Sequence, residues 1–141
     1  MSLEPGLKGS AETVVVHENT AAAVGSGALE VFATPSMIAL MEKTALETVM
    51  PYLAEGESTV GTEIHVTHDS SVPLGFPVTA EAELVAVDRR KLSFRVLARS
   101  GDEVIGQGTH TRFIVSQERF MQKVEAKRQN RRSLRTKRLR N

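Results

Sequence analysis

The sequence predicts an α+β fold in which one long helix packs on one face of a curved antiparallel sheet. Two observations support this. Residues 35–52 repeat apolar side chains with helical spacing, and the segments that follow alternate apolar and polar side chains with the period of a strand. A β-branched run near the N-terminus adds a first strand, so the expected order is β–α–ββββ–α.

The composition is that of one soluble domain with a modest core. The chain has 141 residues, 40% of them hydrophobic and 25% charged, and it contains no cysteine. This excludes disulfides, thiolate metal sites and cysteine nucleophiles, and it fits a cytoplasmic location. No apolar run approaches the roughly 20 residues that span a bilayer. We therefore expect no membrane partner.

The charge divides the chain into two parts. Residues 119–141 contain ten Lys or Arg and one acid, whereas residues 1–118 contain eight bases and sixteen acids. The C-terminal stretch begins with helical spacing and then becomes almost purely basic. We expect a folded domain over residues 10–128 and a disordered, solubilising basic tail over residues 129–141.

The expected strands are 12–18, 59–69, 77–88, 91–100 and 103–116. The last three form a meander, because the two segments between them are typical of hairpin turns. In segment 59–69, strict alternation places Val60, Thr62, Ile64, Val66 and His68 on one face and Gly61 on the other. His68 thus shares the apolar face and is expected to point at whatever the sheet covers.

The helix carries a carboxylate on its apolar side. A wheel at about 100° per residue places Glu42 beside a stripe that contains Ile38, Met41, Ala45, Val49 and Tyr52. An ionised carboxylate is costly there unless it is paired, which makes Glu42 a candidate for chemistry. At the edge of the stripe it would instead reach solvent.

Thr34 and His68 complete a candidate constellation. Thr34 precedes Pro35 and suits a helix N-cap. It lies about 12 Å from Glu42 along the helix axis, so a group from the sheet must come between them. A Thr, a Glu and a His in an apolar cleft would suit activation of water, or of the carboxylate itself, against an acyl group. A helix cap, a solvated carboxylate and a core histidine are the simpler alternatives.

Two further features bear on the site. His17, His65 and His110 lack metal-ligand spacing, so no metal site is expected. Arg112 has inward parity next to Ile114 and needs an anion or an acceptor, for which a structural salt bridge is one use.

One long segment, VFATPSMIALMEKTALETVMPYLAEGESTVGTEIHVTH (31–68), resembles the fluoroacetyl-CoA thioesterases and the wider group of small hot-dog acyl-CoA thioesterases. The likeness continues through residues 78–96 and 103–115. It implies a hot-dog fold, with a sheet wrapped around a central helix, in a homodimer whose sites lie at the subunit interface. It also implies hydrolysis of a short-chain acyl-CoA without a metal or redox cofactor.

The resemblance also implies residue roles. Thr34 would hydrogen-bond the catalytic carboxylate or the acyl group, Glu42 would be nucleophile or general base, and His68 would polarise the reacting group and assist proton transfer. Gly61 would offer its backbone N–H to the thioester oxygen. Arg112 would help to order the substrate pocket.

The chain departs from this family in two places. Segment AVGSGALEVF (23–32) has Gly25 and Ala28 where the family carries phenylalanines in a lid, which implies a more open site for other short acyl groups. The basic tail is the second departure. It could pair with coenzyme A phosphates or bind nucleic acid or another polyanion non-specifically. Nucleic acid is the less expected partner, and the lack of interleaved aromatic residues argues against stacking on single strands.

Two other functions stay open. The first is a non-catalytic acyl-CoA-binding module whose basic tail engages a polyanion. The second is a hot-dog hydratase, which is weaker because hydratases present an Asp and a His within a few residues, where residues 63–68 offer only a Glu.

Overall fold

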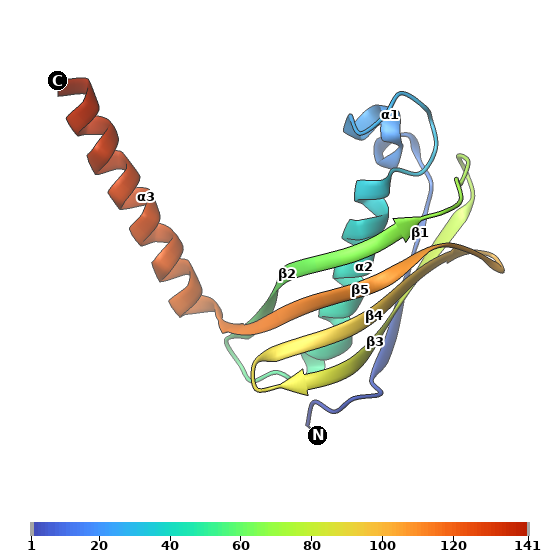
Figure 1. Ribbon diagram of the computed structural model, residues 1–141, viewed down its shortest axis with the longest axis horizontal. Coiled ribbons are helices and arrows are strands. Elements are labelled where there is room, and N and C mark those ends of the chain that lie inside the picture. The colour runs from blue at the N-terminus through green and yellow to red at the C-terminus, as the bar shows by residue number, and fades with distance from the viewer. Residues whose placement is uncertain (1, 141) are drawn as a thin grey trace.

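A five-stranded antiparallel sheet curves around one long helix, as the sequence predicts (Figure 1). The computed structural model describes residues 2–140, with the side chains of 133, 134 and 136–140 left out. The strand order across the sheet is β1-β3-β4-β5-β2. The strands are β1 (Lys8–Val14), β2 (Glu57–His68), β3 (Pro77–Asp88), β4 (Lys91–Ser100) and β5 (Glu103–Ser116), and the longer helices are α2 (Thr34–Val49) and α3 (Gln117–Arg140).

The expected meander is confirmed over the three strands β3, β4 and β5, whose bounds match the predicted segments. Each hairpin closes through two residues, between Asp88 and Lys91 and between Ser100 and Glu103. Arg89 and Gly101 adopt left-handed backbone in these turns, with φ of 57° and 59°. Such backbone matches the twist of the flanking strands.

The first strand lies earlier in the chain than predicted. Strand β1 comprises Lys8–Val14, whereas the β-branched run pointed to residues 12–18. Pairing with β3 ends at Val14, which lies opposite Pro77. Val15 then turns into the core at 1% exposure. Residues 17–19 form a 3-10 turn, and Ala21–Val24 form the short helix α1.

Helix α2 provides one side of the core. Pro35 occupies its first turn, as expected, and a 3-10 turn (Met50–Tyr52) follows its last residue. Its buried stripe is rotated relative to the predicted one: Ile38 and Tyr52 are only half-buried. The buried members are Met37, Leu40, Met41, Thr44, Ala45 and Val49.

Helix α3 continues through the basic residues that were expected to be disordered. It begins at Gln117, directly after β5, and runs to Arg140. It projects away from the rest of the fold (Figure 1). The sequence pattern failed here because α3 has almost no apolar periodicity, so its charges gave no sign of a continuous helix.

Strands β5 and β2 approach very closely at one glycine. A Cβ atom on Gly108 would collide with the backbone carbonyl of His65 in β2. Gly108 lies opposite Val66 in this pair. Only glycine therefore fits here without moving a strand.

Replacing Gly108 by alanine should push β2 away from β5 and lower the free energy of unfolding by roughly 1–3 kcal/mol, as overpacking does. Urea unfolding followed by circular dichroism measures this. Thr109→Ala, on the exposed face of the same strand, is the control and should have little effect. Equal stability of the two variants would contradict the close approach.

Candidate functional site

Thr34 and His68 are joined by a short hydrogen bond. Thr34 Oγ1 lies 2.7 Å from His68 Nδ1. Thr34 is the first residue of α2 rather than its cap: Ala33 is the N-cap, and no side chain caps this end. The prediction of Thr34 as N-cap is therefore wrong, and its hydroxyl serves the histidine instead.

The side chain of His68 lies on the inner face of the sheet, as predicted, and one of its ring nitrogens has no hydrogen-bond partner among the described residues. It is the last residue of β2 and lies opposite Gly106 of β5. Its Nε2 atom is buried and, among the described residues, has no hydrogen-bond partner. Buried polar atoms nearly always have a partner. This nitrogen is therefore available to a group that enters the site.

A pocket of about 250 Å³ opens beside this pair. Thr34 and His68 form part of its wall, and the residues around α1 and the segment after β2 form the rest. Phe32 is an apolar member of the lining, at 2% exposure. The pocket can thus take a small group with an apolar end against His68. Its other lining residues are Ala21, Ser26, Val31, Asp69, Ser70 and Ser71.

Glu42 lies in a second cluster, over Gly61 of β2. One carboxylate oxygen, Oε2, is 3.7 Å from Arg112 Nη1. The same oxygen would lie 2.7 Å from a Cβ on Gly61, so the glycine makes room for the carboxylate. The Glu42 side chain is 41% exposed, against 7% for Arg112. The carboxylate is therefore at the edge of the buried stripe, half open to solvent, and it is paired.

A β-bulge brings Gly61 to this face. In the β2–β5 register, Gly61 lies opposite Arg112 and Glu63 lies opposite Thr111, which leaves Thr62 as the extra residue. Strict alternation placed Gly61 on the face away from Ile64, and this prediction is wrong. The inserted residue shifts the parity by one, so Gly61 and Ile64 share the inner face.

Arg112 is buried in a cradle of acceptors. Its Nε donates to Thr59 Oγ1 at 2.7 Å, and Nη2 donates to the Thr59 carbonyl at 2.9 Å. Burial lowers the pKa of Arg112, and the nearby Glu42 charge opposes this shift. The expectation that Arg112 needs an anion or an acceptor is confirmed, because Glu42 supplies the anion and Thr59 supplies two acceptors.

His110 belongs to the same network, which the sequence did not indicate. It is 2% exposed. Arg112 Nη1 lies 3.2 Å from His110 Nε2, and His110 Nδ1 lies 2.8 Å from the carbonyl of Glu63. Because the guanidinium can only donate, Nε2 accepts and Nδ1–H donates, which fixes a neutral tautomer. The signal available in the sequence was its inward parity with Arg112 in β5.

The structure thus forms two clusters from the five predicted residues. Thr34 and His68 are bonded to each other, while Glu42, Gly61 and Arg112 lie together elsewhere along α2 and β2. No hydrogen bond or ion pair joins the clusters among residues 2–140. No group of His, Asp or Glu that could hold a metal ion occurs in this described part.

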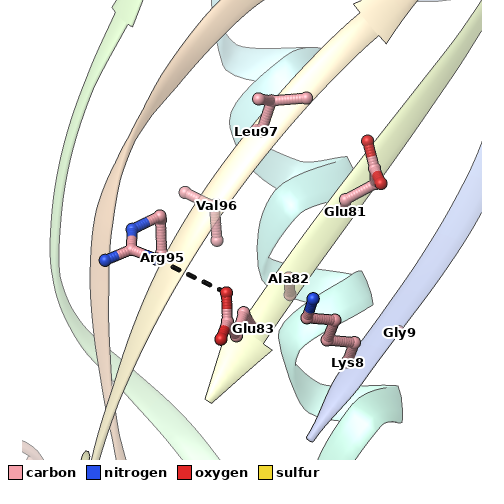
Figure 2. Close-up of a pocket in the computed structure, with 8 residues that line it drawn as sticks. All are labelled: Lys8, Gly9, Glu81, Ala82, Glu83, Arg95, Val96 and Leu97. Carbon is pink, nitrogen blue, oxygen red and sulfur yellow. Dashed lines mark hydrogen bonds and ion pairs between the residues drawn. The ribbon is translucent and has the colours of Figure 1, made fainter. Parts of the chain in front are cut away.

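Another pocket lies on the outer side of the sheet, over β1, β3 and β4 (Figure 2). Its charged side chains include Lys8, Glu83 and Arg95, and Arg95 Nη1 pairs with Glu83 Oε1 at 3.4 Å. None of the five predicted site residues lines it.

Within residues 2–140, no helix is long and apolar enough to cross a membrane.

The pKa of His110 makes a testable contribution to stability. Burial is the main cause that lowers its pKa below 6.5, and the Arg112 charge adds to this; the bond to the Glu63 carbonyl and the Glu42 charge oppose it. The unfolded chain therefore binds a proton at a higher pH than the folded chain does. Stability should fall as pH drops below about 6.5, by at most about 1.4 kcal/mol per pH unit for this group.

His110→Gln should flatten this part of the stability curve between about pH 7.5 and 5. Urea unfolding at a series of pH values measures it. His65→Gln removes an exposed histidine of β2 and should leave the slope as in the wild type. An unchanged slope in His110→Gln would show that His110 does not titrate on unfolding as described.

Comparisons with known proteins agree with the fold and with the likeness seen in the sequence. The family model described as fluoroacetyl-CoA-specific thioesterase matches residues 15–118. A fluoroacetyl-CoA thioesterase from Streptantibioticus cattleyicolor is 47% identical over 98 residues, which is 70% of each chain.

Solved structures extend the agreement. The crystal structure of a Phe-to-Ala variant of the fluoroacetyl-CoA-specific thioesterase superposes with a TM-score of 0.84 at 38% identity, over 90% of this chain and 98% of that one. A thioesterase superfamily member from Thermus thermophilus shares the fold, with a TM-score of 0.85 at 24% identity over 92% of this chain and 96% of its own. The chain has the hot-dog fold, and it belongs to the family of fluoroacetyl-CoA-specific thioesterases.

Proposed function

We propose that this protein hydrolyses the thioester bond of short-chain acyl-CoA molecules, giving the free acid and coenzyme A. The observation that carries the proposal is the Thr34–His68 pair, which leaves a buried ring nitrogen without a protein partner beside a small pocket. The family supplies the reaction class. Solved relatives include a fluoroacetyl-CoA thioesterase variant in complex with fluoroacetate and CoA and another in complex with acetyl-CoA.

The pair would polarise the thioester carbonyl, or transfer a proton from the attacking water or to the leaving sulfur. With Thr34 Oγ1 bound to Nδ1, the imidazole is held in one orientation, and the buried Nε2 would serve a group that enters the pocket which His68 lines. In the tautomer that donates from Nδ1, Nε2 accepts a proton from water as a general base; in the other, it donates to the acyl oxygen or to the leaving sulfur. In both cases the hydroxyl orients the ring, which is the role that a base-orienting group has in other hydrolases.

Glu42 and Gly61 would act at the carbonyl carbon. The carboxylate is held over Gly61 by Arg112, at the exposed edge of the cluster where a substrate can reach it. It attacks the carbon directly, which gives an acyl anhydride on Glu42 that a water molecule then hydrolyses to the free acid, or it takes a proton from an attacking water. In both routes the C–S bond breaks and the coenzyme A sulfur leaves with a proton. A backbone N–H at Gly61 would stabilise the charge that develops on the carbonyl oxygen.

The two clusters would work together in a homodimer. Strand β2 is an edge of the sheet and pairs only with β5 among residues 2–140. An edge strand offers a row of backbone groups to a second chain. Residues Gly61 and His68 both belong to β2, so a second copy paired along it would cover both clusters. We expect size-exclusion chromatography with light scattering to give twice the chain mass.

The substrate would be a short acyl group, with little selection for fluorine. The segment over the pocket contains Gly25 and Ala28 where the family's phenylalanines are expected, and both residues are exposed. A small side chain at each position leaves the acyl end of the pocket less enclosed. Acetyl-CoA and other short acyl-CoA molecules are therefore the expected substrates beside fluoroacetyl-CoA.

Glu42→Gln and His68→Ala should each lower kcat/KM by about 10²–10⁴, the range for loss of a positioned acid–base group. An acyl-CoA hydrolysis assay across chain lengths measures this. Matched controls are Glu47→Gln, on the exposed side of α2, and His65→Ala, on the outer face of β2. Near-normal hydrolysis by both site variants would refute the assignment. Stabilisation by acyl-CoA without turnover in the wild type would favour the binding module instead.

Thr34→Val separates the proposed role of the hydroxyl from a helix-capping role. Valine keeps the shape but removes the bond to His68, so kcat should fall about tenfold, as expected for loss of a hydrogen bond worth ~1–1.5 kcal/mol. Unfolding free energy should change by less than about 0.5 kcal/mol, since Thr34 does not cap α2. Thr34→Ser should keep most of the activity. A stability loss near 1 kcal/mol, the usual value of a cap, with normal kcat would contradict this role.

A further inference from the structure

Helix α3 carries a dense basic surface that the proposed hydrolysis does not use. It is attached to the sheet through its first residue, whose backbone N–H donates to the Gly56 carbonyl at 2.9 Å. From there it projects away from the domain (Figure 1). Gln117 Nε2 also donates to the Glu57 carbonyl at 3.3 Å, so the point of departure is fixed from two directions.

Five of the ten Lys or Arg residues of α3 lie together on one side of the helix. Helical spacing places the basic face, which we define as Lys127, Arg128, Arg131, Arg132 and Arg135, around one concavity that also includes Val124. At about 100° per residue, Gln122, Ala126 and Gln129 fall on the opposite side. These five cations therefore lie in rows along one side of the helix, whereas Arg119 falls on the opposite side and other cations of α3 lie outside this face.

These rows are unfavourable for the free helix. Lys127, Arg131 and Arg135 are spaced at i, i+4 and i+8, and like charges at this spacing destabilise a helix by a few tenths of a kcal/mol per pair. Residues 126–141 contain no Asp or Glu. Glu125 offsets part of this repulsion, because its carboxylate lies 3.6 Å from Arg128 Nε. A polyanion along the basic face would remove this repulsion.

We propose that the basic face binds the sugar–phosphate backbone of double-stranded DNA, without sequence specificity. Arg and Lys pair well with phosphate, and a helix about 10–12 Å in diameter fits the major groove, which is about 12 Å wide. The missing aromatic residues argue against stacking on single strands, which this mode of binding does not need. Contacts to a duplex backbone need only cations in a fixed row, and the helix provides this row.

An anionic membrane fits the surface less well. A helix that lies in a membrane interface needs a continuous apolar face opposite its charges. Residues 127–141 contain two apolar residues, Leu134 and Leu139, among eight Lys or Arg. Among the residues of α3 whose side chains the structure describes, the large apolar ones that are exposed, Phe120, Met121 and Val124, lie in its first turns.

The basic face also lies far from the pocket of its own chain. Ser116, just before α3, lies opposite Glu57 at the start of β2, whereas His68 is at the other end of this strand. Twelve residues of strand span roughly 35 Å. The DNA proposal therefore does not rest on the pocket of the same chain.

Fluorescence anisotropy with a labelled, mixed-sequence duplex of about 20 base pairs tests the proposal on the full chain. Binding should weaken steeply between about 50 and 200 mM salt, with a log–log slope of about −4 to −5 if the five cations each contact a phosphate. The variant Lys127→Gln/Arg131→Gln/Arg135→Gln should lose about three units of this slope and weaken Kd at least about tenfold. Its acyl-CoA hydrolysis should stay at the wild-type rate.

The matched control is Lys8→Gln/Lys43→Gln/Lys91→Gln, which removes three exposed cations from the domain and changes the net charge equally. It should bind the duplex within about twofold of the wild type. Equal loss in both variants, or no salt-dependent binding by the wild type, would overturn the proposal. So would binding to phosphatidylserine vesicles without binding to the duplex. A higher KM for acyl-CoA in the α3 variant, with unchanged duplex binding, would assign the face to coenzyme A instead.

Discussion

The buried guanidinium of Arg112 is the constraint on which the inner face of this sheet depends. A cation that is 7% exposed is tolerated only where its donors are satisfied. Thr59, His110 and Glu42 surround it, and the bulge at Thr62 brings Gly61 beneath the carboxylate. The position and charge of the Glu42 carboxylate thus follow from the need to pair the buried guanidinium of Arg112. Removing any one of its partners would leave a charge or a hydrogen-bond donor unpaired.

The same face of the sheet carries two histidines, His110 and His68, that differ in how many of their ring nitrogens are hydrogen-bonded. In the Arg112 network, both ring nitrogens of His110 have a hydrogen-bond partner, which fixes its tautomer and leaves no ring nitrogen for a substrate. His68 has one nitrogen bound to Thr34 and the other left over. Two histidines of one sheet face therefore differ in what they can do, because one is saturated by the fold and the other is not.

The sequence predicted most elements because hairpins and the long helix have strong local signals. It could not predict what depends on pairing across the sheet. Strand β1 begins at Lys8 because β3 lies beside it, although its residues have little strand preference. The bulge reversed the parity of Gly61, and His110 had no local motif. Thr34 fits a cap by composition, yet its hydroxyl is directed to His68, which is 34 residues away in the chain.

The bulge has a further consequence for how the chain associates. A long, regular edge strand can recruit further strands without limit, and such edges lead to aggregation. In β2, the extra residue at Thr62 interrupts the regular repeat of backbone groups between Gly61 and Glu63. A neighbouring chain that pairs along β2 is therefore restricted in its register by this interruption. The irregularity that shapes the inner face also protects the outer edge from growing into an open-ended sheet.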